Sequence, residues 1–233
     1  MKGKFIVIEG PDGAGKSTIA NRFFDILKMY GEKVILTREP GGLPAAEDIR
    51  KIVKSYKLNQ KQQTMLFMAS MNLNIEENIL PKLEDGYTII CDRYLRSTYI
   101  YQGYADITDF DIGINKKKWF SELTKWACNG LLPDLEFVLD VSKNVAWERM
   151  HKRNESPDAI ESNGRKFLDE INDKYKYTFN NIYGWNYPQY QINANKCEED
   201  VLLNILQIYY SYTNVDIKVI EKILSEAKDT KNE

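Results

Sequence analysis

A glycine-rich segment near the start of the chain constrains the fold more than any other feature. An apolar run at residues 5–8 leads into Gly10-Pro-Asp-Gly-Ala-Gly-Lys-Ser17, and a helical pattern with apolar positions 19, 23, 24 and 27 follows. This order of strand, loop and helix is the setting in which the pattern G-x-x-x-x-G-K-[ST] cradles phosphate groups. The segment therefore predicts that the protein binds a nucleoside triphosphate.

Each part of this loop has a physical task. The glycines let successive backbone N–H groups turn towards a triphosphate, and the helix N-terminus adds positive potential there. Lys16 can reach the β- and γ-phosphates, and the Ser17 hydroxyl group can ligate Mg²⁺. The residues that we expect to bind ATP are Gly10, Gly13, Ala14, Gly15, Lys16, Ser17 and Thr18.

Composition narrows the class of protein. The 233 residues, 43% of them hydrophobic, suffice for one domain with a sizeable core. A balance of 32 basic and 34 acidic residues disfavours a dedicated nucleic-acid binder. The three cysteines are too few and too scattered for a disulfide framework or a zinc site, and Cys91 lies in an apolar run typical of a buried thiol. We find no signal peptide and no run of membrane-spanning length, and expect a cytoplasmic protein.

Short apolar runs alternate with longer helical stretches along most of the chain. We expect strands at 4–8, 33–37, 87–91, 135–141 and 189–193. Helices are expected at 16–30, 44–55, 60–84, 116–129, 143–153, 164–183 and 197–212. This alternation predicts an α/β fold with a five-stranded parallel sheet flanked by helices. One domain would span 1–213, and 214–233 would be a helical extension with a frayed end.

A second pair of charged residues narrows the chemistry. Asp92 follows the third predicted strand, where phosphate-loop enzymes place the acid of the Mg²⁺ site. We therefore expect Ser17 and Asp92 to serve the metal. Arg93 presents a bidentate fork suited to a phosphate, although an Asp-Arg pair can also be a plain structural salt bridge.

Several short motifs occur together in one order. They are TREPGG at 37–42, DRY at 92–94, STYIYQG at 97–103, LPDL at 132–135 and LDV at 139–141. Together with the phosphate loop, they resemble thymidylate kinases of the bacterial type, from about residue 4 to the early 200s. The resemblance implies a phosphate-loop nucleoside monophosphate kinase with a short lid. Its implied reaction is phosphoryl transfer from ATP to dTMP, giving dTDP and ADP, with Mg²⁺ as cofactor.

The same resemblance implies roles for individual residues. Asp12 would approach the deoxyribose 3′-OH, Phe67 would stack on the pyrimidine, and Tyr101 would exclude a 2′-hydroxyl group. Thr98 and Gln102 would read the base edge. Phe67 could equally be core, because it lies in an amphipathic helix. The residues assigned in this way to the acceptor nucleotide are Asp12, Arg38, Glu39, Pro40, Arg50, Phe67, Met71, Arg93, Ser97, Thr98, Tyr101 and Gln102.

The family also implies a cationic lid, here at about 149–165. Arg149, Lys152 and Arg153 fall at i, i+3 and i+4 on one helix face, which could also be a solvated basic face. A lid would keep water away from the phosphoryl group. The expected catalytic residues are Lys16, Asp12, Arg93, Arg149 and Arg153.

Two departures from the family pattern leave alternatives open. Met71 stands where the family has an arginine that reads the base, which favours a kinase of dUMP or a modified deoxyuridylate as one alternative. Ala159 stands where the family lid carries an arginine, so Arg149, Arg153 or Arg165 would have to supply that cation. The loss of the lid arginine also leaves open a nucleotide-binding regulator with weak catalysis.

The resemblance further implies a homodimer. Its interface would use the helices at 60–84 and 116–129, whose apolar faces could also be ordinary core. The residues of these faces are Met65, Leu66, Met68, Trp119, Phe120, Leu123 and Trp126.

Overall fold

The computed structural model describes residues 3–103, 116–152, 159–179 and 186–214. Its centre is an all-parallel sheet in the order β2-β3-β1-β4-β5. The strands are β1 (Lys4–Glu9), β2 (Val34–Arg38), β3 (Thr88–Asp92), β4 (Leu135–Asp140) and β5 (Gln189–Asn193). Each predicted strand is confirmed to within one residue at either end. Since β1 pairs with both β3 and β4, the phosphate loop leaves the sheet from its central strand.

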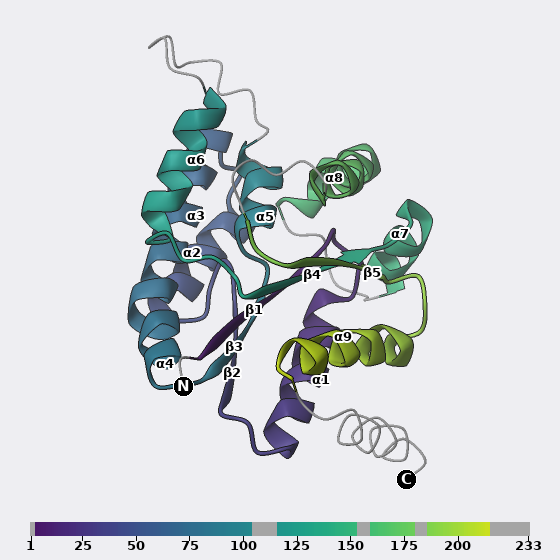
Figure 1. Ribbon diagram of the computed structural model, residues 1–233. Helices are drawn as coiled ribbons and strands as arrows, with labels where there is room; N and C mark the ends of the chain where they lie inside the picture. Colours follow the sequence, from purple (N-terminus) through teal and green to yellow (C-terminus); the bar gives the residue numbers. More distant parts are fainter. Residues whose placement is uncertain (1–2, 104–115, 153–158, 180–185, 215–233) are drawn as a thin grey trace.

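Alternate residues of β1 feed two different cores. Ile6 and Ile8 face α1 (Lys16–Met29) and α9 (Glu198–Tyr212), which cover one side of the sheet in Figure 1. Phe5 and Val7 face the other side, where α3 (Gln60–Asn74) and its continuation pack. A strand buried on both faces reads as a continuous apolar run, which is the pattern at residues 5–8.

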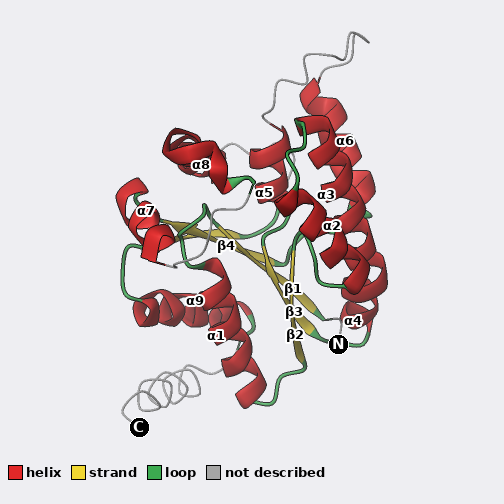
Figure 2. Cartoon of the chain, turned by 180° about the vertical axis from the view of Figure 1, so that it is seen from behind, coloured by secondary structure: helices red, strands yellow, loops and turns green. Residues whose placement is uncertain are grey.

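The remaining helices complete the two layers. Figure 2 shows α2 (Pro44–Ser55) and α6 (Lys116–Ala127) on the same side of the sheet as α3. Beyond β4 come α7 (Lys143–Lys152), the short 3₁₀ turn η3 (Glu161–Asn163) and α8 (Gly164–Phe179). Where the structure describes them, the predicted helices agree with the observed bounds to within two residues, and the predicted ends at 153 and 180–183 lie outside the described residues.

The predicted helix at 60–84 is helical over its whole length, and its middle is a π-helical turn. After α3 the chain forms a π-helical turn, η1 (Ile75–Ile79), and then α4 (Leu80–Glu84), where Pro81 lies in the first turn. Proline lacks the N–H group that would continue the ladder of helix hydrogen bonds, and the ladder changes its spacing in the π-helical turn directly before Pro81. The sequence also failed to predict α5 (Leu95–Thr98) and the π-helical turn η2 (Tyr99–Gly103), which follow β3.

The apolar faces of α3 and α6 are only partly available for an interface. Met68 and Phe120 are 5% and 2% exposed and pack against each other's helix within this chain. Met65 and Trp126 on the same two helices are 65% and 76% exposed. Met68 and Phe120 therefore belong to the core, the alternative that the sequence left open for these faces, and Met65 and Trp126 remain exposed for an interface.

Several predictions fall wholly or partly on residues that the structure does not describe. They concern Arg153, the ends of the predicted helices at 143–153 and 164–183, part of the lid at 149–165, and the extension at 214–233. Cys91, by contrast, is fully buried, as predicted. Among the described residues, no helix is both long enough and apolar enough to cross a membrane.

Candidate active site

A cavity of about 540 Å³ opens at the carboxyl ends of the strands. Its walls come from the phosphate loop, the segment between β2 and α2, the β3–α5 turn, α7 and the turn between β5 and α9. This edge of a parallel sheet is where ligands bind in open α/β folds. The cavity thus brings the separate sequence motifs to one place.

The phosphate loop has the backbone that its glycines allow. Gly13 has φ +79°, and a Cβ atom there would lie 2.3 Å from the carbonyl oxygen of Ala146 on α7. Lys16 is 6% exposed, and its Nζ donates to the carbonyl oxygen of Pro11 at 2.8 Å. Burial, and then the nearby Arg93, lower the pKa of Lys16 to about 8. A bound polyphosphate would add negative charge beside this lysine and favour its charged form.

Ser17 and Asp92 lie together as a metal site requires. The Ser17 hydroxyl group donates to Oδ2 of Asp92 at 2.5 Å, although the loop and β3 are far apart in sequence. The other oxygen of Asp92, Oδ1, is buried and has no hydrogen-bond partner among the described residues. A hydroxyl group and a carboxylate with a free oxygen are ligands that suit Mg²⁺. These two residues therefore fit the predicted cation.

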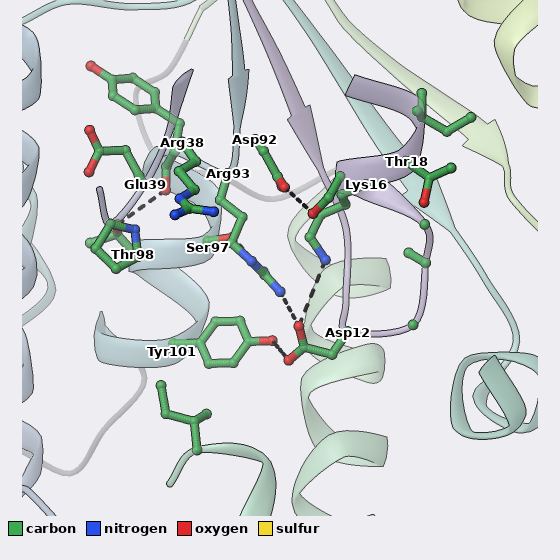
Figure 3. A pocket seen from close by; sticks show the side chains of 18 of the residues that line it. Asp12, Lys16, Thr18, Arg38, Glu39, Asp92, Arg93, Ser97, Thr98 and Tyr101 are labelled. Atoms are coloured by element: carbon green, nitrogen blue, oxygen red, sulfur yellow. Dashed lines mark hydrogen bonds and ion pairs between the residues drawn. The ribbon is translucent and has the colours of Figure 1, made fainter. Parts of the chain in front are cut away.

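Arg93 is the centre of the site. Its backbone is left-handed (φ 71°), and its guanidinium group forms an ion pair with Asp12 of the phosphate loop. Nη1 also donates to Oγ of Ser97 at 3.0 Å, and the Tyr101 hydroxyl group donates to Oδ2 of Asp12 at 2.8 Å. Figure 3 shows Lys16, Arg93 and Tyr101 converging on Asp12. The two cations therefore lie beside one carboxylate.

One ion pair and one hydrogen bond to a backbone carbonyl group hold the segment after β2. Arg38 makes a bidentate contact with Glu47, at 2.9 Å from Nε and 2.7 Å from Nη2. Arg50 donates to the carbonyl oxygen of Pro40 at 3.0 Å. Arg38, Pro40 and Arg50 line the cavity, whereas Glu47 does not. The predicted acceptor residues of this segment thus reach the site, with Arg38 already paired.

The residues predicted to contact the base also belong to the cavity wall. Phe67, Met71, Thr98 and Gln102 all line it. The Thr98 hydroxyl group donates to the carbonyl oxygen of Tyr94 at 3.1 Å, so its proton is already engaged. Gln102 is 1% exposed, and its Nε2 has no hydrogen-bond partner among the described residues. The amide of Gln102 is therefore a donor ready for a ligand.

Glu39 is a buried acid in the same wall. It is 4% exposed, and its Oε1 accepts from Nδ2 of Asn74 at 2.7 Å. Its Oε2 is buried and without a partner in the part of the chain described. Burial raises the pKa of Glu39 to about 8. This carboxyl group is therefore largely protonated at neutral pH.

Arg149 and Arg165 lie in different surroundings. Arg149 lines the cavity, and its guanidinium group donates to the carbonyl oxygens of Ala194, at 2.9 Å, and Lys196, at 3.4 Å. Arg165 donates to Oδ1 of Asn144 at 2.8 Å and is not among the described residues that line the cavity. Of the three arginines considered for the lid cation, only Arg149 is placed at the site by the described residues.

Sequence reasoning missed several residues that shape the site. Glu9 is fully buried and accepts from the backbone N–H groups of Tyr94, at 2.7 Å, and Ser97, at 2.9 Å. It thereby fixes the start of α5. An acid at the end of an apolar strand was the available signal. Lys54, Ile160 and Glu161 also line the cavity.

The fold and the site together define a phosphate-loop nucleoside monophosphate kinase. Comparison with known proteins agrees: the family profile described as "Thymidylate kinase" matches residues 8–202. A thymidylate kinase of Exiguobacterium sp. (strain ATCC BAA-1283 / AT1b) is 37% identical over 174 residues, which cover 73% of this chain and 78% of that protein. One of Staphylococcus haemolyticus (strain JCSC1435) is 36% identical over 173 residues, covering 74% and 81%. The chain belongs to the thymidylate kinase family.

Proposed function

We propose that this protein transfers a phosphoryl group from ATP to dTMP, giving dTDP and ADP. Membership of the thymidylate kinase family supports this reaction. The structural observation that carries the proposal is the pairing of Arg93 with Asp12 beside Lys16. One cation belongs to the loop for the donor, and the other is free to face an acceptor phosphate once a ligand competes with Asp12.

Positioning and charge would do most of the catalysis. Phosphoryl transfer needs little covalent help, provided that the donor and acceptor oxygens are held in line and their charge is neutralised. Lys16 and the loop N–H groups would bind the donor phosphates, and Arg93 the acceptor phosphate. Arg149 would hold the ATP side of the cavity, because its guanidinium group is fixed to the turn that precedes α9.

Ser17 and Asp92 would hold Mg²⁺ with the donor phosphates. The cation, when bound, would neutralise part of the charge on these phosphates. Asp12 would lie between the two cations and near the deoxyribose 3′-OH. Tyr101 would close the sugar side of the site, since its hydroxyl group is fixed on Asp12 at 2.8 Å.

The remaining acceptor residues would form the nucleoside pocket. Phe67 would stack on the pyrimidine, with Pro40 and Arg50 nearby, while the free amide of Gln102 would bind the base edge. Met71 supplies no hydrogen bond, so Gln102 would be the main polar reader of the base.

We also propose that the protein is a homodimer through α3 and α6. The support is the exposure of Met65 and Trp126 on two helices that pack against each other. Light scattering measures the mass in solution, and a monomer at micromolar concentration would contradict this proposal.

A coupled assay of ADP release tests the reaction. The panel of acceptors is dTMP, dUMP, dCMP, dGMP and UMP, each with ATP and Mg²⁺. We expect dTMP to give the highest kcat/KM. If kcat/KM is higher for dUMP than for dTMP, the substrate is dUMP or a modified deoxyuridylate instead of dTMP. If no acceptor is phosphorylated, the kinase assignment is refuted.

A further inference from the structure

A buried tyrosine on α8 contacts the arginine at the centre of the site. Tyr175 is 3% exposed, and Nη1 of Arg93 donates to its hydroxyl oxygen at 3.2 Å. The same hydroxyl group lies 2.7 Å from Oγ of Ser97 and donates to Oε2 of Glu9 at 2.9 Å. Tyr175 is not among the described residues that line the cavity. It can therefore act on a ligand only through these partners.

The donors and acceptors of this cluster fix the direction of its hydrogen bonds, which run from Arg93 to Glu9. A guanidinium group can only donate, so the hydroxyl oxygens of Ser97 and Tyr175 must accept from Arg93. Their protons then go towards Glu9, since Ser97 Oγ also donates to Oε2 of Glu9 at 2.7 Å. If the proton of one hydroxyl group lies between the two hydroxyl oxygens instead, the other hydroxyl group still donates to Glu9. Two hydroxyl groups thus link a cation in the cavity wall to a buried acid.

These contacts leave the Nη2 edge of Arg93, which is paired with Asp12, for a ligand that competes with Asp12. Nη1 faces Ser97, Tyr175 and the carbonyl oxygen of Gly10, whereas Nη2 faces Asp12. Bidentate binding of a phosphate depends on the plane of the guanidinium group. Contacts along the Nη1 side set that plane, and Tyr175 provides the one that comes from α8.

The rest of α8 supports the same wall of the site. Phe167, Ile171 and Tyr175 follow one another at i, i+4 and i+8, so they share one face of the helix. Phe167 packs on Tyr101 with ring centroids 6.5 Å apart, and Ile171 packs in the cluster that contains Ile100. The ribbons of α8 and α5 lie close together in Figures 1 and 2, in agreement with these contacts.

We propose that Tyr175 is a positioning residue for the acceptor phosphate, because its hydroxyl group holds the guanidinium group of Arg93 in the plane that binds the phosphate. This inference rests on the proposed function of the site. It predicts that loss of one hydroxyl group, deep in α8 and outside the cavity, weakens acceptor binding and spares the donor.

The variant Tyr175→Phe tests this with the smallest change. Tyr177→Phe is the matched control, because Tyr177 lies on the same helix and is 60% exposed. Steady-state kinetics would give kcat and the KM for dTMP and for ATP, and calorimetry would give the affinity for dTMP and for thymidine. We expect Tyr175→Phe to raise the KM and the dissociation constant for dTMP about tenfold, the effect of one hydrogen bond to a charged group. The KM for ATP, the affinity for thymidine and kcat should change less than about twofold by the same reasoning.

Some kinetic results would contradict a positioning role for Tyr175. An equal weakening of ATP or thymidine binding, or the same loss in Tyr177→Phe, would show a general effect of α8 and overturn the inference. A fall in kcat with an unchanged KM for dTMP would overturn it as well. Thermal unfolding would show that each variant is folded.

A crystal structure of Tyr175→Phe separates this inference from the proposed reaction. We expect the guanidinium group of Arg93 to be rotated or poorly ordered; an unmoved Arg93 would overturn the positioning role. This readout needs no activity. If the wild-type protein phosphorylated none of the five acceptors, the proposed function would fail while the position of Arg93 in the variant would still decide the role of Tyr175.

Discussion

Lys16 is the residue whose removal should separate catalysis from stability. Burial lowers the pKa of Lys16 to about 8, so its charge is not a strong source of stability in the free protein. We expect Lys16→Ala to keep the thermal midpoint and to lower kcat by about 10²-fold or more, as removal of a charge-stabilising group does. Lys28→Ala, at an exposed position near the end of the same helix, is the control. Turnover close to that of the wild type would remove Lys16 from the catalytic residues.

Glu39 should make stability depend on pH. Its pKa is raised to about 8 by burial, against an ordinary value of 4.5. Between these pH values the folded protein keeps a proton that the unfolded chain releases, so the free energy of unfolding falls as the pH rises. The contribution is complete below about pH 4.5 and is lost as the pH passes 8.

The variant Glu39→Gln should remove this dependence, because an amide does not titrate. We expect its thermal midpoint to exceed that of the wild type more at pH 8.5 than at pH 5. Glu84→Gln changes an exposed acid and serves as the control. Parallel curves for Glu39→Gln and the wild type across this range would show that Glu39 ionises as an exposed acid does.

Met71 should limit the discrimination among bases. It is 1% exposed and lines the cavity while packing in the apolar cluster beneath it. A site that hydrogen-bonds its substrate rejects analogues by about 10⁴-fold, whereas apolar contacts give roughly 10–200-fold. We therefore expect Met71→Arg to increase the preference for dTMP over dCMP, and to change dTMP against dUMP less. The measurement is kcat/KM for the three acceptors, with Met71→Leu as the apolar control. An unchanged ratio, with dCMP already rejected about 10⁴-fold by the wild type, would mean that another residue reads the base.

At the scale of elements, the loop and the strands could be predicted because their signals are local. Gly10 to Ser17 form one contiguous motif, and every strand except β5 contains a short apolar run. The contacts of Glu9 with Tyr175 could not be predicted, because they join residues 166 positions apart and leave no common pattern. The π-helical turn η2 was missed for a related reason. Glu9 of β1 fixes the start of α5, which leads directly into η2, and η2 packs against α8; these tertiary contacts override local propensity.

The close contact between the phosphate loop and α7 gives a prediction about this pair of elements. A Cβ atom at Gly13 would lie 2.3 Å from the carbonyl oxygen of Ala146, and Gly13 has φ +79°. We expect Gly13→Ala to push the loop from α7 and to raise the KM for ATP more than the KM for dTMP. Gly15→Ala has similar strain (φ +91°) but no atom within 4 Å of the added Cβ, so it separates backbone strain from the clash. Equal effects of the two variants would mean that strain alone is responsible.

At the scale of the whole molecule, the hydrophobic cores bury nearly all large apolar side chains of the sheet. Helices α3 and α6, by contrast, each leave a large apolar side chain exposed. Met65 and Trp126 remain 65% and 76% exposed, while Met68 and Phe120 between them are buried. Burying an exposed side chain of this size contributes about 1.5–3 kcal/mol. A self-complementary pair of such helices would therefore favour a two-fold dimer.

Charge on this face should dissociate the proposed dimer and leave each subunit folded. Met65→Glu and Trp126→Glu both place a carboxylate where the partner would bury it, so we expect light scattering to show a monomer for either variant and a dimer for the wild type. Met29→Glu is the matched control, because Met29 is 57% exposed at the end of α1, away from these helices. Thermal unfolding of the variants at low concentration should match that of the wild type, since the side chains are exposed within one chain. If Met29→Glu dissociated the protein and the other two variants did not, the interface would lie at α1 instead.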